Sequence, residues 1–338
     1  MKTELQDAKR IVLAHYDAIA RATPETVATA LAANTSTNWH WRGLHPFHEQ
    51  TGAAAVAQTY WAPFLTSMKS VQRRQDVFFA GRNTDDDDDV WVASMGHMLA
   101  LFDAPFLGIR PTQKIVMYRY AEFNRVVGDK IVETASFCDL LHLMSQAGVN
   151  PMPPQTGIHL VQPGPATHDG LLFDEQDAQV GRDTMQLINR MIGDIDANSN
   201  DKDTPRDATP QEELQRCWHD DMLWWGPEGV GATYTIDRYI QQHQQPFRRQ
   251  LGNRQFNGHI ARISEGTYGG FFGWPNLTLT PLGGYMGMPG NGTVRADMRV
   301  VDIYRRDGDK LAENWIFIDV LHFLNQQGLD VLARLEQT

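Results

Sequence analysis

The chain has 338 residues, 42% of them hydrophobic and nine of them tryptophan, which is enough apolar material for two cores and excludes a disordered or fibrous protein. Its formal net charge of −11 disfavours nucleic acid and anionic membrane surfaces as partners, because both attract basic proteins. No apolar run approaches the ~18 residues that suggest a membrane span, and the N-terminus has no signal-peptide core. Since only two cysteines occur, Cys138 and Cys217, we expect a cytoplasmic protein without a disulfide framework.

The first half of the chain predicts helices followed by strands. Apolar residues recur at helical spacing over 3–22, Thr23-Pro24 is a helix-start signal, and an alanine- and aromatic-rich stretch predicts a helix over 52–68. The runs that follow have the length and composition of strands, at 75–82, 90–102, 113–127 and 130–139.

The second half repeats this order. An amphipathic segment covers 183–197, Thr209-Pro210 opens a helix, a longer helix is expected over 235–250, and strand-like runs start at 254. Residues 150–180 are rich in proline and glycine and lack periodicity, so they are typical of a linker. We therefore expect a first domain, a linker and a second domain, at 1–149, 150–180 and 181–338.

A long internal repeat supports this division. Residues 128–148 read GDKIVETASFCDLLHLMSQAG and residues 308–328 read GDKLAENWIFIDVLHFLNQQG, at a constant offset. A lone acid, Asp139 or Asp319, interrupts the apolar run of each copy. Repetition over such a distance predicts duplicated domains rather than a solenoid. Other identical pairs are Arg119 and Arg299, Arg125 and Arg305, Glu133 and Glu313, Leu141 and Leu321, His142 and His322, Gln146 and Gln326, and Gly148 and Gly328.

The order of elements predicts the fold class. Gly128-Asp129-Lys130 supplies a tight turn, so the last two predicted strands of the first copy form a hairpin. Helices that precede a meandering sheet favour an α+β fold, with helices packed on one face of a curved, mostly antiparallel sheet in each copy.

Three motifs resemble those of the SnoaL-like polyketide cyclases, which have the nuclear-transport-factor-like (cystatin-like) α+β cone fold. The first is Gly96-His97 followed by Pro105 to Thr112, similar to the family's G-x-H…F-x-G-I-P-P-T loop. The second runs from Glu122-Phe123 to Glu133. The third is the ending Asp139…Leu141…Gln146-Ala147-Gly148, and Trp315 supplies the family's tryptophan four residues before Asp319. The resemblance implies two tandem cone domains.

The resemblance also implies a reaction. In the cyclases, an aspartate at this position is the general acid/base of an intramolecular aldol-type ring closure, which uses no metal and no cofactor. Asp139 and Asp319 match that position. The family's histidine on a neighbouring strand is missing here. The strand instead offers Arg119 and Glu122 in the first copy, and Arg299 and Asp302 in the second.

The residues themselves give two interpretations of these aspartates. Side chains alternate along a strand, so Asp139 shares a face with Phe137, and Asp319 shares one with Trp315 and Phe317. Desolvation beside these rings would raise a carboxyl pKa toward neutrality, as proton transfer requires, and a neighbouring arginine would stabilise an oxyanion. Alternatively, each aspartate is the N-cap of a short helix that ends at a glycine, which needs no catalysis.

Further candidates are wall residues of the pockets. His40 and Trp41 lie in the stretch TNWHWRGLHPFHEQ, and His97 lies in the loop motif. Trp225 and Tyr268 belong to the aromatic residues of the second copy. Glu122 and Asp302 are candidate pocket or support residues, and we expect a solvated or salt-bridged role for them rather than catalysis. No histidine spacing matches a common metal signature, and no nicotinamide, flavin or phosphate motif occurs, so we expect neither metal nor cofactor.

The leading functional hypothesis is a cofactor-independent cyclase or isomerase that acts on a small polyketide-like or carbonyl compound. One alternative is a non-catalytic protein whose apolar cavities bind a small molecule. Another is a hydrolase or dehydratase in which His142 or His322 assists the aspartate. As partners we expect a small apolar or carbonyl-containing molecule, no nucleic acid and no membrane. We also expect the two copies to form an internal pseudo-dimer, which could oligomerise further.

Overall fold

The computed structural model describes residues 4–84, 89–158, 160–197 and 209–335. The chain divides into two compact units. Unit 1 consists of Met1–Pro151, Pro163–Glu175 and Asp319–Thr338, and unit 2 of Met152–Gln162 and Gln176–Ile318. This division differs from the expected domains in two ways. The expected linker is divided between the units, with Pro163–Glu175 in unit 1 and Met152–Gln162 in unit 2. The chain from Asp319 onward belongs to unit 1 instead of the second domain.

Unit 1 is built on a six-stranded sheet in the order β2-β1-β6-β5-β4-β3. The β5–β6 hairpin turns at Gly128, whose φ of 62° lies in the left-handed region that favours glycine. β1 is parallel to β6, and the other neighbours are antiparallel. Its strands are β1 (Thr35–Gly43), β2 (Glu49–Thr51), β3 (Met68–Arg82), β4 (Val90–Phe102), β5 (Ile115–Val127) and β6 (Lys130–Cys138).

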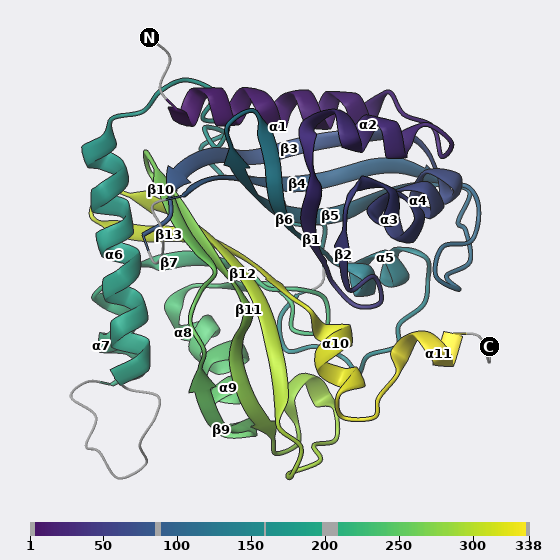
Figure 1. The fold of residues 1–338 in the computed structure, drawn as a ribbon. Helices are drawn as coiled ribbons and strands as arrows, with labels where there is room; N and C mark the ends of the chain where they lie inside the picture. The colour runs from purple at the N-terminus through teal and green to yellow at the C-terminus, as the bar shows by residue number, and fades with distance from the viewer. Residues whose placement is uncertain (1–3, 85–88, 159, 198–208, 336–338) are drawn as a thin grey trace. The chain divides into compact units, whose positions relative to one another are not determined.

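The helices of unit 1 include the long α1, which packs against β3 and β4 (Figure 1). Its buried residues Ile11, Val12, Tyr16 and Ile19 form the apolar stripe that the sequence spacing predicts. The helical elements are α1 (Glu4–Ala20), α2 (Val27–Asn34), α3 (Ala53–Val56), the π-helical turn η1 (Ala57–Trp61), α4 (Ala62–Ser67), α5 (Leu140–Gln146), α10 (Val320–Asn325) and α11 (Val331–Leu335).

Unit 2 repeats this plan with one difference in its sheet. The order is β10-β11-β12-β13-β7-β8, and β9 also pairs with β11. Where unit 1 has the single strand β3, unit 2 has two strands separated by residues 257–260. The strands are β7 (Trp218–Trp225), β8 (Thr233–Tyr234), β9 (Leu251–Phe256), β10 (Ala261–Glu265), β11 (Tyr268–Pro281), β12 (Ala296–Asp307) and β13 (Lys310–Ile318).

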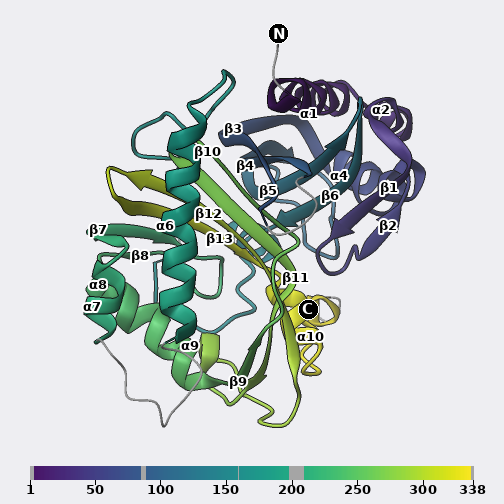
Figure 2. The ribbon, with the colours of Figure 1, turned by 60° about the vertical axis from the view of Figure 1, so that its left-hand side comes forward.

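The helices of unit 2 include α6, which packs against β10, β11 and β13 (Figure 2). α7 begins with a full capping box, in which Thr209 and Glu212 each bond to the other's backbone. The helical elements are α6 (Ala178–Ala197), α7 (Pro210–Gln215), α8 (Ile236–Tyr239), the π-helical turn η2 (Ile240–Gln244), α9 (Gln245–Gln250) and a 3₁₀ turn, η3 (Tyr285–Gly287).

The two units therefore share one architecture, and the predicted α+β class with two sheets is confirmed. Trp41 pairs with Thr134 in unit 1, and Trp224 pairs with Asn314 at the corresponding point of unit 2. Gly43 and Pro46 favour a loop around Trp41, whereas the structure has β1 there. Among the described residues, no helix combines the length and apolarity needed to cross a membrane.

Candidate active site

Unit 2 contains a cavity of about 300 Å³ between its helices and its sheet. Most of its wall is apolar or aromatic, as in sites that bind small organic ligands. Polar groups enter from the strands β12 and β13, from the helical segment α8–η2–α9, and from β9, β11 and residues 257–260. The polar lining residues include Tyr239, His243, Gln244, Arg248, His259, Asp302, Tyr304 and Asn314.

The alternation of side chains along β12 and β13 brings the polar groups of the sheet together. Asp302 and Tyr304 are two positions apart on β12, so they lie on one face. Asn314, Ile316 and Ile318 supply the same face from β13. Figure 2 shows β12 and β13 side by side, and Asp302 pairs with Ile316 across them.

Asp302 is the ionisable carboxyl group of this cavity. Asp302 is 8% exposed, and burial raises the pKa of its carboxyl group to about 7. Hydrogen bonds from Asn314 and Tyr304 oppose this rise. Asn314 Nδ2 donates to Asp302 Oδ1 at 3.0 Å. No ion pair to Asp302 is found in the part of the chain that the structure describes. A carboxyl group of this kind exchanges protons near neutral pH.

The two imidazoles of the cavity are neutral. Burial lowers the pKa of both His243 and His259 to about 3, and Arg262 lowers that of His259 further. The His243 ring stacks on Trp224 at a centroid distance of 4.0 Å, and the His259 ring stacks on Phe271 at 3.9 Å. These rings therefore present flat, uncharged surfaces to a ligand.

Two tyrosines keep their phenolic protons. Burial and the nearby Asp302 raise the pKa of both Tyr239 and Tyr304 above the ordinary value. Both residues line the cavity. The Tyr304 hydroxyl donates to Asp302, so Tyr239 is the tyrosine that can donate a hydrogen bond to a substrate oxygen.

The corresponding acid of unit 1, Glu122, has a different environment. Arg73 Nη1 donates to Glu122 Oε2 at 3.0 Å, and Ser136 Oγ donates to Glu122 Oε1 at 3.4 Å. The Arg73 guanidinium lies over the rings of Tyr16 and Tyr120, 3.8 and 4.4 Å from their centroids. Unit 1 has a cavity of about 310 Å³, which Arg73 lines and Glu122 does not. Glu122 thus has a structural role, in which Arg73 balances its charge.

Asp139 and Asp319 both have N-cap geometry. Asp139 Oδ1 accepts from the backbone N–H of His142 at 3.0 Å, and Asp319 Oδ1 accepts from that of His322 at 3.2 Å. Asp319 Oδ2 also accepts from the His45 backbone N–H at 3.0 Å. Neither aspartate is among the residues that line the two cavities described above. These bonds match the capping interpretation of the repeated sequence.

Three of the other expected pocket residues make contacts away from the unit 2 cavity. The buried Arg119 lies 3.8 Å from Asp139, and burial lowers the pKa of its guanidinium to about 9. His97 Nδ1 lies 3.4 Å from Asp76 Oδ2. Arg299 lies over the Trp274 ring at 4.2 Å.

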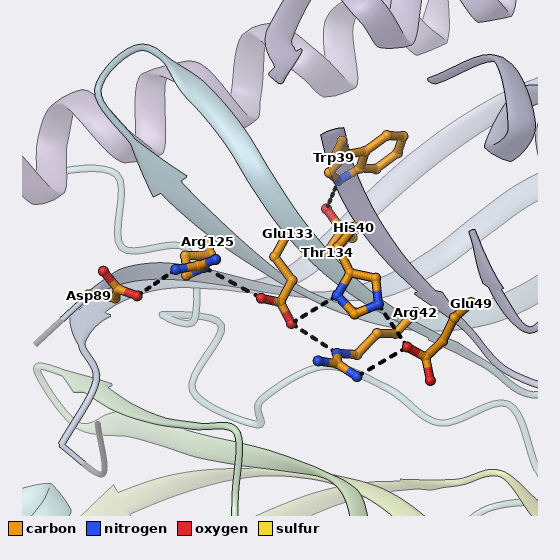
Figure 3. A network of polar contacts seen from close by, with 8 residues as sticks. All are labelled: Trp39, His40, Arg42, Glu49, Asp89, Arg125, Glu133 and Thr134. Carbon is orange, nitrogen blue, oxygen red and sulfur yellow. Dashed lines mark hydrogen bonds and ion pairs between the residues drawn. The ribbon is translucent and has the colours of Figure 1, made fainter. Parts of the chain in front are cut away.

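His40 and Trp41 lie on opposite faces of β1. His40 belongs to a network of polar contacts that links β1, β2, β5 and β6 (Figure 3). Its Nε2 is 2.7 Å from Glu49, and Glu133 lies between His40, Arg42 and Arg125 at 3.8, 2.9 and 3.5 Å. Trp41 instead stacks on Tyr60 at 5.6 Å in the core of unit 1.

The remaining aromatic candidates, Trp225, Tyr268 and Trp315, are buried in unit 2 but do not line its cavity. Of the expected pocket residues, Asp302 alone does. The polar lining residues that were not predicted from the sequence include Tyr239, His243, Tyr304 and Asn314. The two-residue spacing of Asp302 and Tyr304 was a usable signal for a shared face. Among the described residues, no group of three or more His, Cys, Asp or Glu side chains could hold a metal ion.

No family model and no curated protein matches the chain. Solved structures similar to part of it include an NTF2-like protein from Burkholderia thailandensis, with 21% identity over 43% of this chain and 98% of that protein, at a TM-score of 0.32. A proposed SnoaL-like polyketide cyclase from Jannaschia has 18% identity over 46% and 99%, at 0.33. A proposed polyketide cyclase from Xanthomonas campestris has 16% identity over 43% and 99%, at 0.34. These descriptions name the family that the sequence motifs resemble.

Proposed function

We propose that unit 2 is a proton-transfer enzyme of the isomerase or cyclase type, which acts on a small apolar carbonyl compound. Asp302 is the general acid/base. One observation carries this proposal: a buried carboxyl group with a pKa near 7 and no ion-pair partner among the described residues lies in the wall of an apolar cavity.

The chemistry follows from the positions of the polar groups. The Asp302 carboxylate removes a proton from the carbon next to the substrate carbonyl, and the C–H electron pair moves into the enolate. Tyr239 donates a hydrogen bond to the enolate oxygen. Asp302 then returns its proton to another carbon, which completes an isomerisation. In a ring closure, the enolate carbon instead attacks a second carbonyl of the same molecule, and the proton goes to the new alkoxide.

Asn314 has a positioning role in this reaction. Its Nδ2 donates both to Asp302 Oδ1 and to the carbonyl oxygen of Ile303, at 3.0 and 3.1 Å. The amide therefore fixes the orientation of the Asp302 carboxyl group through Oδ1.

The resemblance to the cyclases assigned the acid/base role to Asp139 and Asp319. We place it at Asp302 instead, because both of the other carboxylates accept capping hydrogen bonds and neither lines the unit 2 cavity. Glu122 has the matching position in unit 1, but its ion pair with Arg73 removes its use as a base.

The test is deuterium exchange at the carbon next to the carbonyl of α-tetralone, followed by NMR in D₂O. The wild-type protein should accelerate exchange, with a midpoint near pH 7, and Asp302→Asn should lower the rate about 10²-fold or more. Glu122→Gln is the matched control in unit 1 and should leave the rate unchanged. Exchange by Asp302→Asn at the wild-type rate would overturn the proposal and leave a binding function for the cavity.

A further inference from the structure

The cavity of unit 2 has a second group of polar residues on η2 and α9. Gln244 and Arg248 are four residues apart, His243 directly precedes Gln244, and all three line the cavity. Each has a buried polar atom without a hydrogen-bond partner in the described part of the protein: His243 Nδ1, Gln244 Oε1 and Arg248 Nη1. A buried polar atom without a partner costs about 1–3 kcal/mol, so three such atoms around one cavity point to a ligand group that bonds to them.

Unit 1 shows that the fold does not require polar residues here. Its π-helical turn η1 and helix α4 place Tyr60, Trp61 and Leu65 at the corresponding positions. The proline of the helix that follows, Pro63 or Pro246, fixes this correspondence. Aromatic and apolar side chains are therefore sufficient for packing at these positions, and packing does not require the polar residues of unit 2.

The charge of Arg248 is balanced inside the protein. Arg248 Nη2 donates to Glu213 Oε1 at 2.7 Å, and the two side chains are 9% and 2% exposed. Gln244 Nε2 donates to the same Glu213 oxygen at 3.2 Å, which leaves Gln244 Oε1 as an acceptor. A ligand group at this place thus meets one donor, Arg248 Nη1, whose charge is balanced by Glu213, and one acceptor, Gln244 Oε1.

The hydroxyl group has the matching chemistry. It accepts a hydrogen bond from Arg248 and donates one to Gln244, whereas a carboxylate lacks the proton for Gln244 and is repelled by Glu213. His243 Nδ1 adds a third contact in either tautomer. Tyr239 lies close to both polar groups of the cavity. Besides burial, Asp302 raises the pKa of the Tyr239 hydroxyl and Arg248 lowers it.

We propose that His243, Gln244 and Arg248 form a second polar subsite that binds a hydroxyl group, so that the substrate is a hydroxylated carbonyl compound. The hydroxyl lies at this subsite while the carbonyl lies beside Asp302. Placing both groups in one substrate rests on the function proposed above.

Calorimetric titration with α-tetralone derivatives tests the subsite separately from the reaction. The probes carry a hydroxyl, a methyl or a carboxylate group on the aromatic ring, away from the ketone. The wild-type protein should bind the hydroxyl probe at least about tenfold more tightly than the methyl probe. Gln244→Leu should abolish this difference while Glu213 and Arg248 stay paired. Ile316→Val, which alters only an apolar wall, should weaken both probes by the same factor.

Equal binding of the hydroxyl and methyl probes, or tighter binding of the carboxylate probe, would overturn the subsite. Asp302→Asn should keep the hydroxyl preference. If it does so and still exchanges deuterium at the wild-type rate, the proposed reaction fails and the subsite stands. If Asp302→Asn loses exchange but the wild-type protein shows no hydroxyl preference, the reaction stands and the subsite fails.

Discussion

Arg73 forms an ion pair of 3.0 Å with Glu122 in unit 1, and the corresponding acid of unit 2, Asp302, has no such partner among the described residues. The position of Arg73 is occupied in unit 2 by Phe256. Arg73 pairs with Met98 and Met98 with Tyr118, while Phe256 pairs with Leu277 and Leu277 with Met298. The same cross-strand path therefore ends on a cation in one unit and on an aromatic ring in the other.

This difference predicts the effect of Phe256→Arg. Phe256 lines the cavity and is 45% exposed, so an arginine can replace it without burying its whole length. A guanidinium within about 4–6 Å of Asp302 should lower the pKa of that carboxyl group by about 1–3 units. The midpoint of the pH–rate profile for deuterium exchange should fall by the same amount. Phe256→Met, which adds no charge, should leave the midpoint in place. An unshifted midpoint in Phe256→Arg would mean that the residue at position 256 does not influence the pKa of Asp302.

The reverse change in unit 1 predicts a loss of stability. Arg73→Met leaves Glu122, which is 5% exposed, without its cation, and breaking a buried pair on one side costs about 3–5 kcal/mol. Urea denaturation should show this loss. The double variant Arg73→Met/Glu122→Met should recover much of it, because no buried charge is left. A double variant as unstable as the single one would mean that Arg73 acts through packing on Tyr16 and Tyr120.

The sequence predicted the architecture better than the site. Turn and capping signals located most elements, and the repeat of 128–148 in 308–328 predicted two copies of one sheet. The functional face could not be predicted from alternation, because β13 is buried on both faces. Trp315 and Asn314 are equally enclosed, and hydrophobicity does not show which of them faces the helices.

The sequence also did not show which residues of the two copies correspond in the stretches that precede the repeated segments 128–148 and 308–328. The offset that aligns β6 with β13 does not align Arg73 with Phe256, since the loops between these elements differ in length. The interruption of the edge strand at 257–260, which brings His259 to the cavity, has no counterpart in unit 1. Loops tolerate such changes, so local sequence alone could not relate these residues.

Asp302 should make stability depend on pH. The pKa of its carboxyl group is about 7 in the folded chain and 3.8 as the ordinary value. Below about pH 4 both states hold the proton, so the group has no effect. As the pH rises from 4 to 7, the unfolded chain releases the proton and the folded chain keeps it, so the free energy of unfolding falls, by up to roughly 4 kcal/mol above pH 7.

Asp302→Asn removes this penalty while Asn314 keeps an acceptor. The variant should therefore gain stability relative to the wild type between pH 4 and pH 8, as measured by urea denaturation at each pH. A constant difference across this range would mean that the carboxyl group is not raised in the folded state.

His243 should make stability depend on pH in the opposite direction from Asp302, over an overlapping pH range. The pKa of its imidazole is about 3 in the folded chain and 6.5 as the ordinary value. As the pH falls from 6.5 toward 3, the unfolded chain takes up a proton and the folded chain does not, so stability is lost. His243→Phe, which preserves the stack on Trp224, should lose less stability between pH 6.5 and pH 4 than the wild type. Parallel curves for the two proteins would contradict burial of a neutral His243.

Asp319 allows capping to be separated from catalysis. Asparagine caps helices about as well as aspartate and also accepts hydrogen bonds through its side-chain oxygen. Asp319→Asn should therefore change the free energy of unfolding by less than ~1 kcal/mol and leave deuterium exchange unchanged. Asp319→Ala removes the acceptor of both the His322 and the His45 backbone N–H groups. It should cost about 2 kcal/mol, the sum of a lost cap and a lost hydrogen bond. If Asp319→Asn were stable but lost exchange activity, the acid/base group would be Asp319, and the repeated aspartate would be chemistry rather than architecture.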